Sequence, residues 1–121
     1  GYPEVSLGIC PAVVAPWLVR KIGHGPARAM LLQGGTRNGE AAFKMGLVDH
    51  LVPHQELNTA TIDLAEKLSH GGGAAVAATK AWLNELEGPV SLETLERGAV
   101  LSTDVIAGAE AQERLKKLYS R

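Results

Sequence analysis

The sequence predicts a mostly helical chain that belongs to a larger fold whose sheet-bearing half is missing here. In the second half, apolar residues recur three and four positions apart, the spacing of helices, with breaks at 71–73 and 88–89. The first half holds two short apolar segments, 2–9 and 47–52, whose composition suits extended chain. Two isolated extended segments cannot form a stable sheet by themselves. We therefore expect the strands that complete the sheet to lie outside this chain.

Composition narrows the class of protein. The chain has 121 residues, of which 45% are hydrophobic, enough for one domain with a core. The net charge of −1, with scattered Lys and Arg, argues against nucleic acid or an anionic membrane as the main partner. No apolar run is as long as a transmembrane helix, and we expect no secretory signal. The single cysteine, Cys10, indicates a reducing compartment and no disulfide within the chain.

Proline and glycine residues predict where the helices of the first half begin and end. Pro16 and Pro26 suit the first turn of a helix, and Gly23 suits the position after the last turn. Asn38 is an expected N-cap, because its side chain can accept a bond from a free N–H of the first turn. The helices expected here are 16–21, 27–33 and 39–45.

The second half is expected to be entirely helical. Ser91 is a further expected N-cap. The last helix carries two ion pairs of favourable order four residues apart, Glu110 with Arg114 and Glu113 with Lys117. The helices expected here are 57–68, 75–86, 92–103 and 107–119.

Glu4 is the single carboxylate between Pro3 and Arg20, in the least polar part of the chain. Burial among its apolar neighbours would disfavour the charged form, as suits a general acid or base. The alternative is an ordinary glutamate, exposed at an edge or paired with a lysine. The residues alone leave both readings open.

The other reactive residue types show no catalytic or metal-binding spacing. His50 and His54 flank Pro53 and cannot share a helix face, so we expect no metal site. Cys10 has no neighbouring histidine or cation and is expected to be a small buried thiol. The glycines of 71–73 follow a helix rather than a strand, which favours a turn over a phosphate-binding loop.

Two long stretches match the pattern of a known family. They are PEVSLGICP, residues 3–11, and RKIGHGPARAMLLQGGTRNGEAAFKMGLVDHLVP, residues 20–53. The matching residues, in order, are Pro3-Glu4, Leu7-Gly8, Pro11, Gly23, Ala27, Gly34, Glu40-Ala41, Gly46-Leu47-Val48 and Pro53, with Lys80 and the 102–108 tail. The ordered set resembles the second half of the crotonase superfamily, the enoyl-CoA hydratase/isomerase family. The resemblance implies an α/β, crotonase-like spiral fold for the full protein. Residues 1–53 would end its core and carry the acyl-pocket turn, and 54–121 would form a helical trimerisation region.

The resemblance also implies a reaction. In hydratases of this family, two backbone N–H groups hold the thioester oxygen as it becomes an enolate, and two glutamates handle the water and the proton. Glu4 matches the second glutamate and is therefore the expected catalytic residue. The oxyanion-hole segments and the other glutamate are expected before residue 1, so we expect the isolated chain to be an inactive fragment of a lyase of fatty acid metabolism. An isomerase, another acyl-CoA lyase or hydrolase, and a non-catalytic scaffold remain alternatives.

The expected binding residues follow from the same resemblance. The family often has a glycine-rich turn after the proline matching Pro11, whereas here residues 12–16 read AVVAP, so the acyl-chain shape stays open. Lys116 and Lys117 either contact CoA phosphates of a neighbouring subunit or form a solvated face. The residues expected to line the acyl pocket are Leu7, Gly8, Pro11, Ala12 and Trp17.

The partners implied are an acyl-CoA thioester and further copies of the chain in a homotrimer or a hexamer built as a dimer of trimers. Neither a metal nor a separate cofactor is expected, because coenzyme A is part of the substrate. The expected location is the cytoplasm, or the mitochondrial matrix in a eukaryote.

Overall fold

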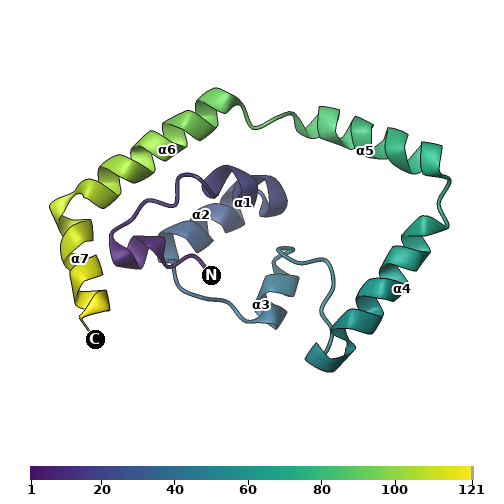
Figure 1. The fold of residues 1–121 in the computed structure, drawn as a ribbon, viewed down its shortest axis with the longest axis horizontal. Helices are drawn as coiled ribbons and strands as arrows, with labels where there is room; N and C mark the ends of the chain where they lie inside the picture. Colours follow the sequence, from purple (N-terminus) through teal and green to yellow (C-terminus); the bar gives the residue numbers. More distant parts are fainter. Residues whose placement is uncertain (121) are drawn as a thin grey trace. The chain divides into compact units, whose positions relative to one another are not determined.

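The computed structural model describes residues 1–120, and this range is helical with no strand (Figure 1). Contacts divide the chain into two compact units. The first unit joins Gly1–Asp49 to the C-terminal part from Val90, and the second is His50–Pro89. In chain order, the elements are the 3-10 helix η1 (Glu4–Leu7), α1 (Ala15–Ile22), α2 (His24–Gln33), α3 (Gly39–Lys44), the 3-10 helix η2 (His54–Glu56), α4 (Leu57–Ser69), α5 (Gly73–Glu87), α6 (Leu92–Ala107) and α7 (Ala109–Tyr119).

The strand predicted over 2–9 is wrong, because this segment folds into the single turn η1. The amide of Gly8 donates to the carbonyl of Val5 at 3.1 Å, and that of Ile9 donates to Glu4 at 2.8 Å. Gly8 closes the turn with φ at 74°, a left-handed conformation that glycine adopts without strain. A strand would need a neighbouring strand for these groups, and residues 1–120 contain none. The segment 47–52 is likewise irregular, so the predicted last strand of the sheet is absent from this range.

The core of the first unit lies between α1 and α2. Leu18 of α1 is buried against Ala27 and Met30 of α2. The prediction for α1 is confirmed, with Pro16 in its first turn and the amide of Gly23 donating to the carbonyl of Val19 at 2.8 Å. The helix predicted over 27–33 begins earlier, at His24, directly after Gly23. Half-buried side chains packed around this core are Tyr2, Val19, Ile22, Leu31, Met45 and Leu47.

Both predicted N-caps are confirmed. The side chain of Asn38 accepts a bond from the amide of Ala41 at 2.9 Å and opens α3. The hydroxyl of Ser91 accepts from the amide of Thr94 at 3.1 Å and opens α6. The boundary between the last two helices differs from the prediction. Helix α6 continues to Ala107, and α7 begins after Gly108.

The two ion pairs predicted on the last helix are present. Arg114 Nη2 lies 2.8 Å from Glu110 Oε1, and Lys117 Nζ lies 2.7 Å from Glu113 Oε1. All four side chains are exposed, so each pair supports the helix only modestly.

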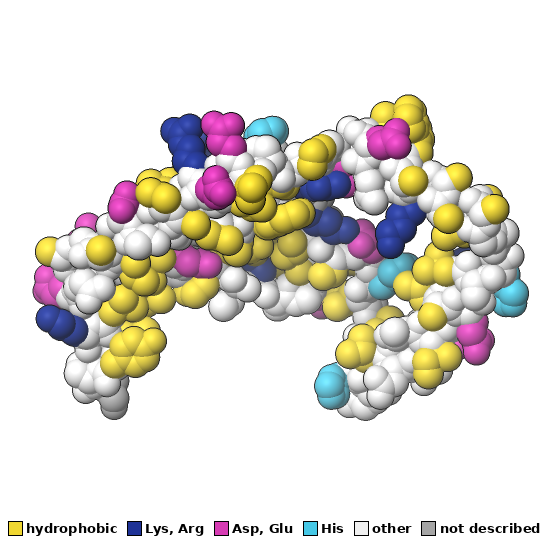
Figure 2. Space-filling view, turned by 45° about the horizontal axis from the view of Figure 1, so that its top comes forward, with side chains coloured by type: hydrophobic (Ala, Val, Ile, Leu, Met, Phe, Trp, Pro, Cys, Tyr) yellow, Lys and Arg dark blue, Asp and Glu magenta, His cyan; other side chains and the backbone are white. Residues whose placement is uncertain are grey.

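The second unit has no core of its own. Neither α4 nor α5 contains a buried residue, and the two helices follow one another without packing side by side (Figure 1). Hydrophobic side chains are exposed along both (Figure 2). They are Leu57, Ile62, Leu64, Leu68, Val76, Trp82, Leu83 and Leu86.

Within residues 1–120, no helix combines the length and apolar character needed to cross a membrane. The predicted division between residues 1–53 and 54–121 stays a prediction. Residue 121, at the end of the second predicted region, lies outside the described range. In this chain, α6 and α7 belong with the N-terminal segment, and only His50–Pro89 is set apart.

Candidate active site

The turn that carries Glu4 is held close to the end of α2. The amide of Tyr2 donates to the carbonyl of Gly35 at 2.8 Å. Gly34 is buried against the turn, and a Cβ placed on it would lie 3.1 Å from Ser6 Oγ and 3.2 Å from the Tyr2 carbonyl oxygen. Gly34 also has φ at 67°, a left-handed conformation that glycine adopts without strain, so glycine favours this close approach between η1 and the end of α2.

Glu4 has an unusual environment for a glutamate. Its side chain is not exposed, and its Oε2 atom is buried without a hydrogen-bond partner among the described residues. Buried polar atoms are nearly always hydrogen-bonded, so such an atom needs an explanation. A carboxylate oxygen in this state can accept a bond from a donor that enters the site. The alternative of an exposed or lysine-paired glutamate does not describe this geometry.

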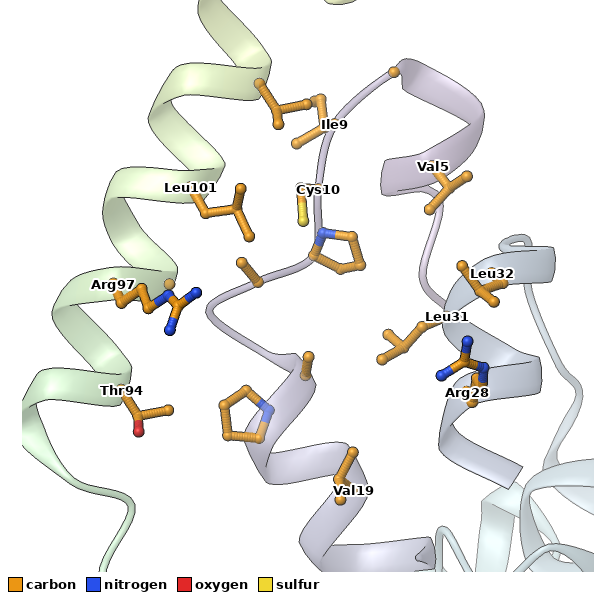
Figure 3. Close-up of a pocket in the computed structure, with 17 residues that line it drawn as sticks. Val5, Ile9, Cys10, Val19, Arg28, Leu31, Leu32, Thr94, Arg97 and Leu101 are labelled. Carbon is orange, nitrogen blue, oxygen red and sulfur yellow. The ribbon is translucent and has the colours of Figure 1, made fainter. Parts of the chain in front are cut away.

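A large apolar pocket lies directly beside the turn, entirely within the first unit (Figure 3). Its volume is about 910 Å³, at the upper end of the range for small-molecule sites, roughly 300–1,000 Å³. Helix α6 forms one wall and α2 another, with the segment that follows Glu4 between them (Figure 3). The lining residues are Val5, Gly8, Ile9, Cys10, Pro11, Ala12, Ala15, Pro16, Val19, Arg28, Leu31, Leu32, Thr94, Arg97, Gly98, Leu101 and Val105.

Some of the residues predicted to bind substrate meet at this pocket and some do not. Gly8, Pro11 and Ala12 line it. Leu7 does not, and Trp17 is half exposed on α1, beside the buried Leu18 in sequence and therefore on another face of that helix.

The two candidate phosphate-binding lysines lie away from the pocket. Lys116 and Lys117 are exposed on α7, and neither lines the pocket. Lys117 donates to Glu113 at 2.7 Å, so part of its hydrogen-bonding capacity is used within the helix.

The wall formed by α6 contains residues that sequence reasoning did not single out. Arg97, Leu101 and Val105 follow one another at intervals of four and therefore share one helix face. The spacing was visible in the sequence. What it could not reveal is that this face meets a segment about ninety residues earlier.

The pocket holds few polar groups. Arg28 from α2 and Arg97 from α6 are the charged residues in its lining (Figure 3). Within the described part of the chain, no three His, Cys, Asp or Glu side chains gather as a metal site would require.

Comparison with known proteins places the chain in a family. Residues 1–119 match the sequence model of enoyl-CoA hydratase/isomerase. A crotonyl-CoA hydratase of Syntrophomonas wolfei is 36% identical over 86 residues, which are 70% of this chain and 33% of the relative. A crystal structure of a provisionally assigned enoyl-CoA hydratase from Streptomyces avermitilis superposes with a TM-score of 0.83 at 28% identity, covering 98% of this chain and 42% of that one. The chain therefore spans about a third of the curated relative's length. It belongs to the enoyl-CoA hydratase/isomerase family.

Proposed function

We propose that this chain is the C-terminal part of a hydratase that adds water to an α,β-unsaturated CoA thioester or removes it. The observation that carries the proposal is the buried, unpartnered Oε2 of Glu4, on a turn that borders an apolar pocket. Val5, the next residue along the chain, lines the pocket, whereas Glu4 itself is not among the lining residues. Family membership supports the reaction class, and the short span of the chain relative to its relatives supports its being part of a longer protein.

In the proposed reaction, Glu4 acts as an acid or base on water. A water molecule bonded to its carboxylate gives a hydroxyl group to the β carbon, and a proton is delivered to the α carbon. Negative charge develops on the thioester oxygen, and fixed backbone N–H groups stabilise such charge without rearranging. We place those N–H groups and the second glutamate outside these 121 residues. The isolated chain is accordingly expected to be inactive.

We place the acyl chain of the substrate in the pocket between α2 and α6. Burial of each methylene there stabilises the complex by about 0.8 kcal/mol. The turn from Pro11 to Ala12 forms part of the wall, so its bulk limits the acyl shapes that fit.

An isomerase is the second candidate, because the segment offers a single carboxylate. A double-bond shift needs one group to take a proton from one carbon and return it to another, whereas hydration must also activate water. Product analysis separates the two reactions, since only hydration adds the mass of water.

The test is Glu4→Gln in the protein as its gene encodes it. Crotonyl-CoA hydration, followed by the loss of enoyl thioester absorbance, should fall by about 10²–10⁴-fold in kcat, the usual contribution of a general acid or base. Glu96→Gln is the matched control, because Glu96 is exposed on α6. A loss of less than about tenfold for Glu4→Gln would exclude the proposed role.

We also propose that copies of the chain associate through the helical region 54–121, as a homotrimer or a dimer of trimers, with the exposed apolar residues of the second unit in the interface. Ile62 and Trp82 are each 58% exposed, and Leu86 is 64% exposed. Apolar surface of this extent in soluble proteins commonly marks an interaction site. The compartment we propose is the cytoplasm, consistent with a single free cysteine.

A further inference from the structure

The segment that carries Glu4 is held by helices from the far end of the chain. We propose that α6 and α7 position residues 4–12 through one continuous line of contacts, in which Ser102 is the main positioning residue. The effect on catalysis rests on the proposed function, whereas the positioning itself can be tested without any activity.

The strongest contact in this line is made by Ser102. Its Oγ donates to the backbone carbonyl of Cys10 at 2.7 Å, in a partly buried position. Cys10 lies in a stretch without regular secondary structure, where a carbonyl has no ladder or helix partner. A partly buried carbonyl of this kind needs a donor from elsewhere, and Ser102 supplies it.

The second contact lies one turn earlier on the same helix. Gly98 is buried, and a Cβ placed on it would lie 3.1 Å from the carbonyl oxygen of Ala12. Gly98 and Ser102 are four residues apart and therefore share one face of α6. Along this face, the helix lies directly against the backbone of the segment.

Helix α7 continues the line toward Glu4. Ala111 is 1% exposed, and a Cβ placed on Gly8 would lie 3.1 Å from its Cα atom. Arg114 Nη1 donates to the carbonyl of Ser6 at 3.3 Å while its Nε donates to Glu110 at 3.0 Å. The bond to Ser6 is long and therefore weaker than that of Ser102.

The four contacts are ordered along both partners. On the segment they fall at every second residue, and on the helices they run in the opposite direction. The pairs are Ser6 with Arg114, Gly8 with Ala111, Cys10 with Ser102 and Ala12 with Gly98. The segment therefore lies antiparallel along α7 and then α6, and loosening one contact should loosen its neighbours.

Cys10 provides a direct probe of this arrangement. It is the single cysteine of the sequence, it is half-buried, and it lies in the segment itself (Figure 3). Removal of the Ser102 hydroxyl should raise the rate at which Cys10 reacts with a disulfide reagent such as DTNB. We expect a roughly 2–10-fold increase, the factor that corresponds to loss of one typical hydrogen bond during local opening.

The variant is Ser102→Ala, with Thr103→Ala as its matched control. The hydroxyl of Thr103 donates to Ala99 within α6 at 2.9 Å, so the control loses the same group without touching the segment. Ser102→Thr keeps a hydroxyl and should restore slow labelling. Gly98→Ala should also accelerate labelling, whereas Gly25→Ala should not, because nothing lies within 4 Å of a Cβ at Gly25.

The result that overturns the proposal is equal labelling of Cys10 in Ser102→Ala, Thr103→Ala and the unmodified chain. If Ser102→Ala lost its helical signal in far-UV CD, the Cys10 labelling rate of Arg114→Gln would test the proposal instead. Its control is Lys117→Gln, which breaks an equivalent ion pair on α7 without reaching the segment.

The same variants test the effect on catalysis in the protein as its gene encodes it. Ser102→Ala should lower kcat for crotonyl-CoA about 3–30-fold, since small displacements of a catalytic group are costly. Thr103→Ala should leave kcat unchanged. If Glu4→Gln also left kcat unchanged, the proposed function would fail, while the Cys10 labelling rates would still decide the positioning.

Discussion

Leu18 is the side chain on which the packing of α1 against α2 should depend most. It is the largest fully buried side chain in the described residues and is 2% exposed. Its partners on α2, Ala27 and Met30, are 0% and 2% exposed. Helix α1 also carries Ala15, Pro16 and Val19 of the pocket wall, so its packing supports the candidate site. Leu18→Ala is therefore a sharp test of the fold.

The expected loss of unfolding free energy depends on how deeply each leucine is buried. Truncation of a buried leucine to alanine costs about 2–5 kcal/mol of unfolding free energy. We expect about 2–3 kcal/mol at Leu18, because half-buried neighbours such as Val19 and Ile22 can partly fill the space. Leu18→Met nearly conserves volume and should cost less than about 1.5 kcal/mol. Leu32→Ala on α2 is the matched control, because Leu32 is 64% exposed and should cost less than about 1 kcal/mol.

The assay is urea unfolding followed by tryptophan fluorescence. The sequence has two tryptophans, so Trp82→Phe leaves Trp17, the neighbour of Leu18 on α1, as the reporter of the first unit. With a slope of about 1–3 kcal/mol per molar urea, Leu18→Ala should lower the midpoint by about 0.7–3 M. A cost within about 0.5 kcal/mol of that of Leu32→Ala would refute the assigned core.

Two further predictions concern the exposed helices. The hydrogen bond and charge of Lys117 hold the pKa of the Glu113 carboxyl below its ordinary value of 4.5, so the pair stabilises the fold above about pH 4.5 and loses this effect as pH falls through the lowered pKa. Lys117→Gln should therefore lower the melting temperature at pH 7 but not at pH 3, and an equal decrease at both would contradict this. In sedimentation, the protein should have three or six times the mass of its chain. Leu86→Glu on α5 should dissociate it and Asn84→Glu should not, whereas a monomeric parent would exclude the proposed assembly.

Local chemistry made much of the helical structure predictable. Pro16 and Gly23 mark the two ends of α1, because proline fits the first turn of a helix and glycine follows the last. Asn38 and Ser91 accept bonds from amides three residues later, as capping side chains do. These signals act within one turn of the helix they define, so no knowledge of the rest of the chain is needed to use them.

The N-terminal segment shows where such reasoning fails. Its alternating apolar residues suggested a strand, yet a strand is stable only beside another strand. In the described chain, the backbone of Glu4–Leu7 bonds within its own turn, and Gly8 closes it. Periodicity identified an apolar segment correctly, but the choice between strand and turn depended on neighbours that the pattern does not specify.

The candidate site depended even more on distant residues. The apolar neighbours of Glu4 predict its importance, and the family pattern predicts that Gly8, Pro11 and Ala12 bind substrate; the last three line the pocket. The opposite wall comes from α6, more than eighty residues away in sequence. Helical spacing groups Arg97 with Leu101 on one face, but it does not say what that face meets.

Helix α6 thus contributes to the site in two ways, by lining the pocket and by holding the segment, and Gly98 does both. Leu101 lines the pocket, whereas Ser102, the next residue, does not line it and donates to the segment that leads from Glu4. Successive residues on a helix point about 100° apart, so Leu101 can be changed without removing the Ser102 hydroxyl. A substitution at Leu101 should alter which acyl chains fit while Cys10 labelling stays slow. A substitution at Ser102 should accelerate labelling and also shift the preference among acyl chains, because Pro11 and Ala12 of the held segment line the pocket. Selectivity can therefore be changed without positioning, whereas a change in positioning also changes selectivity.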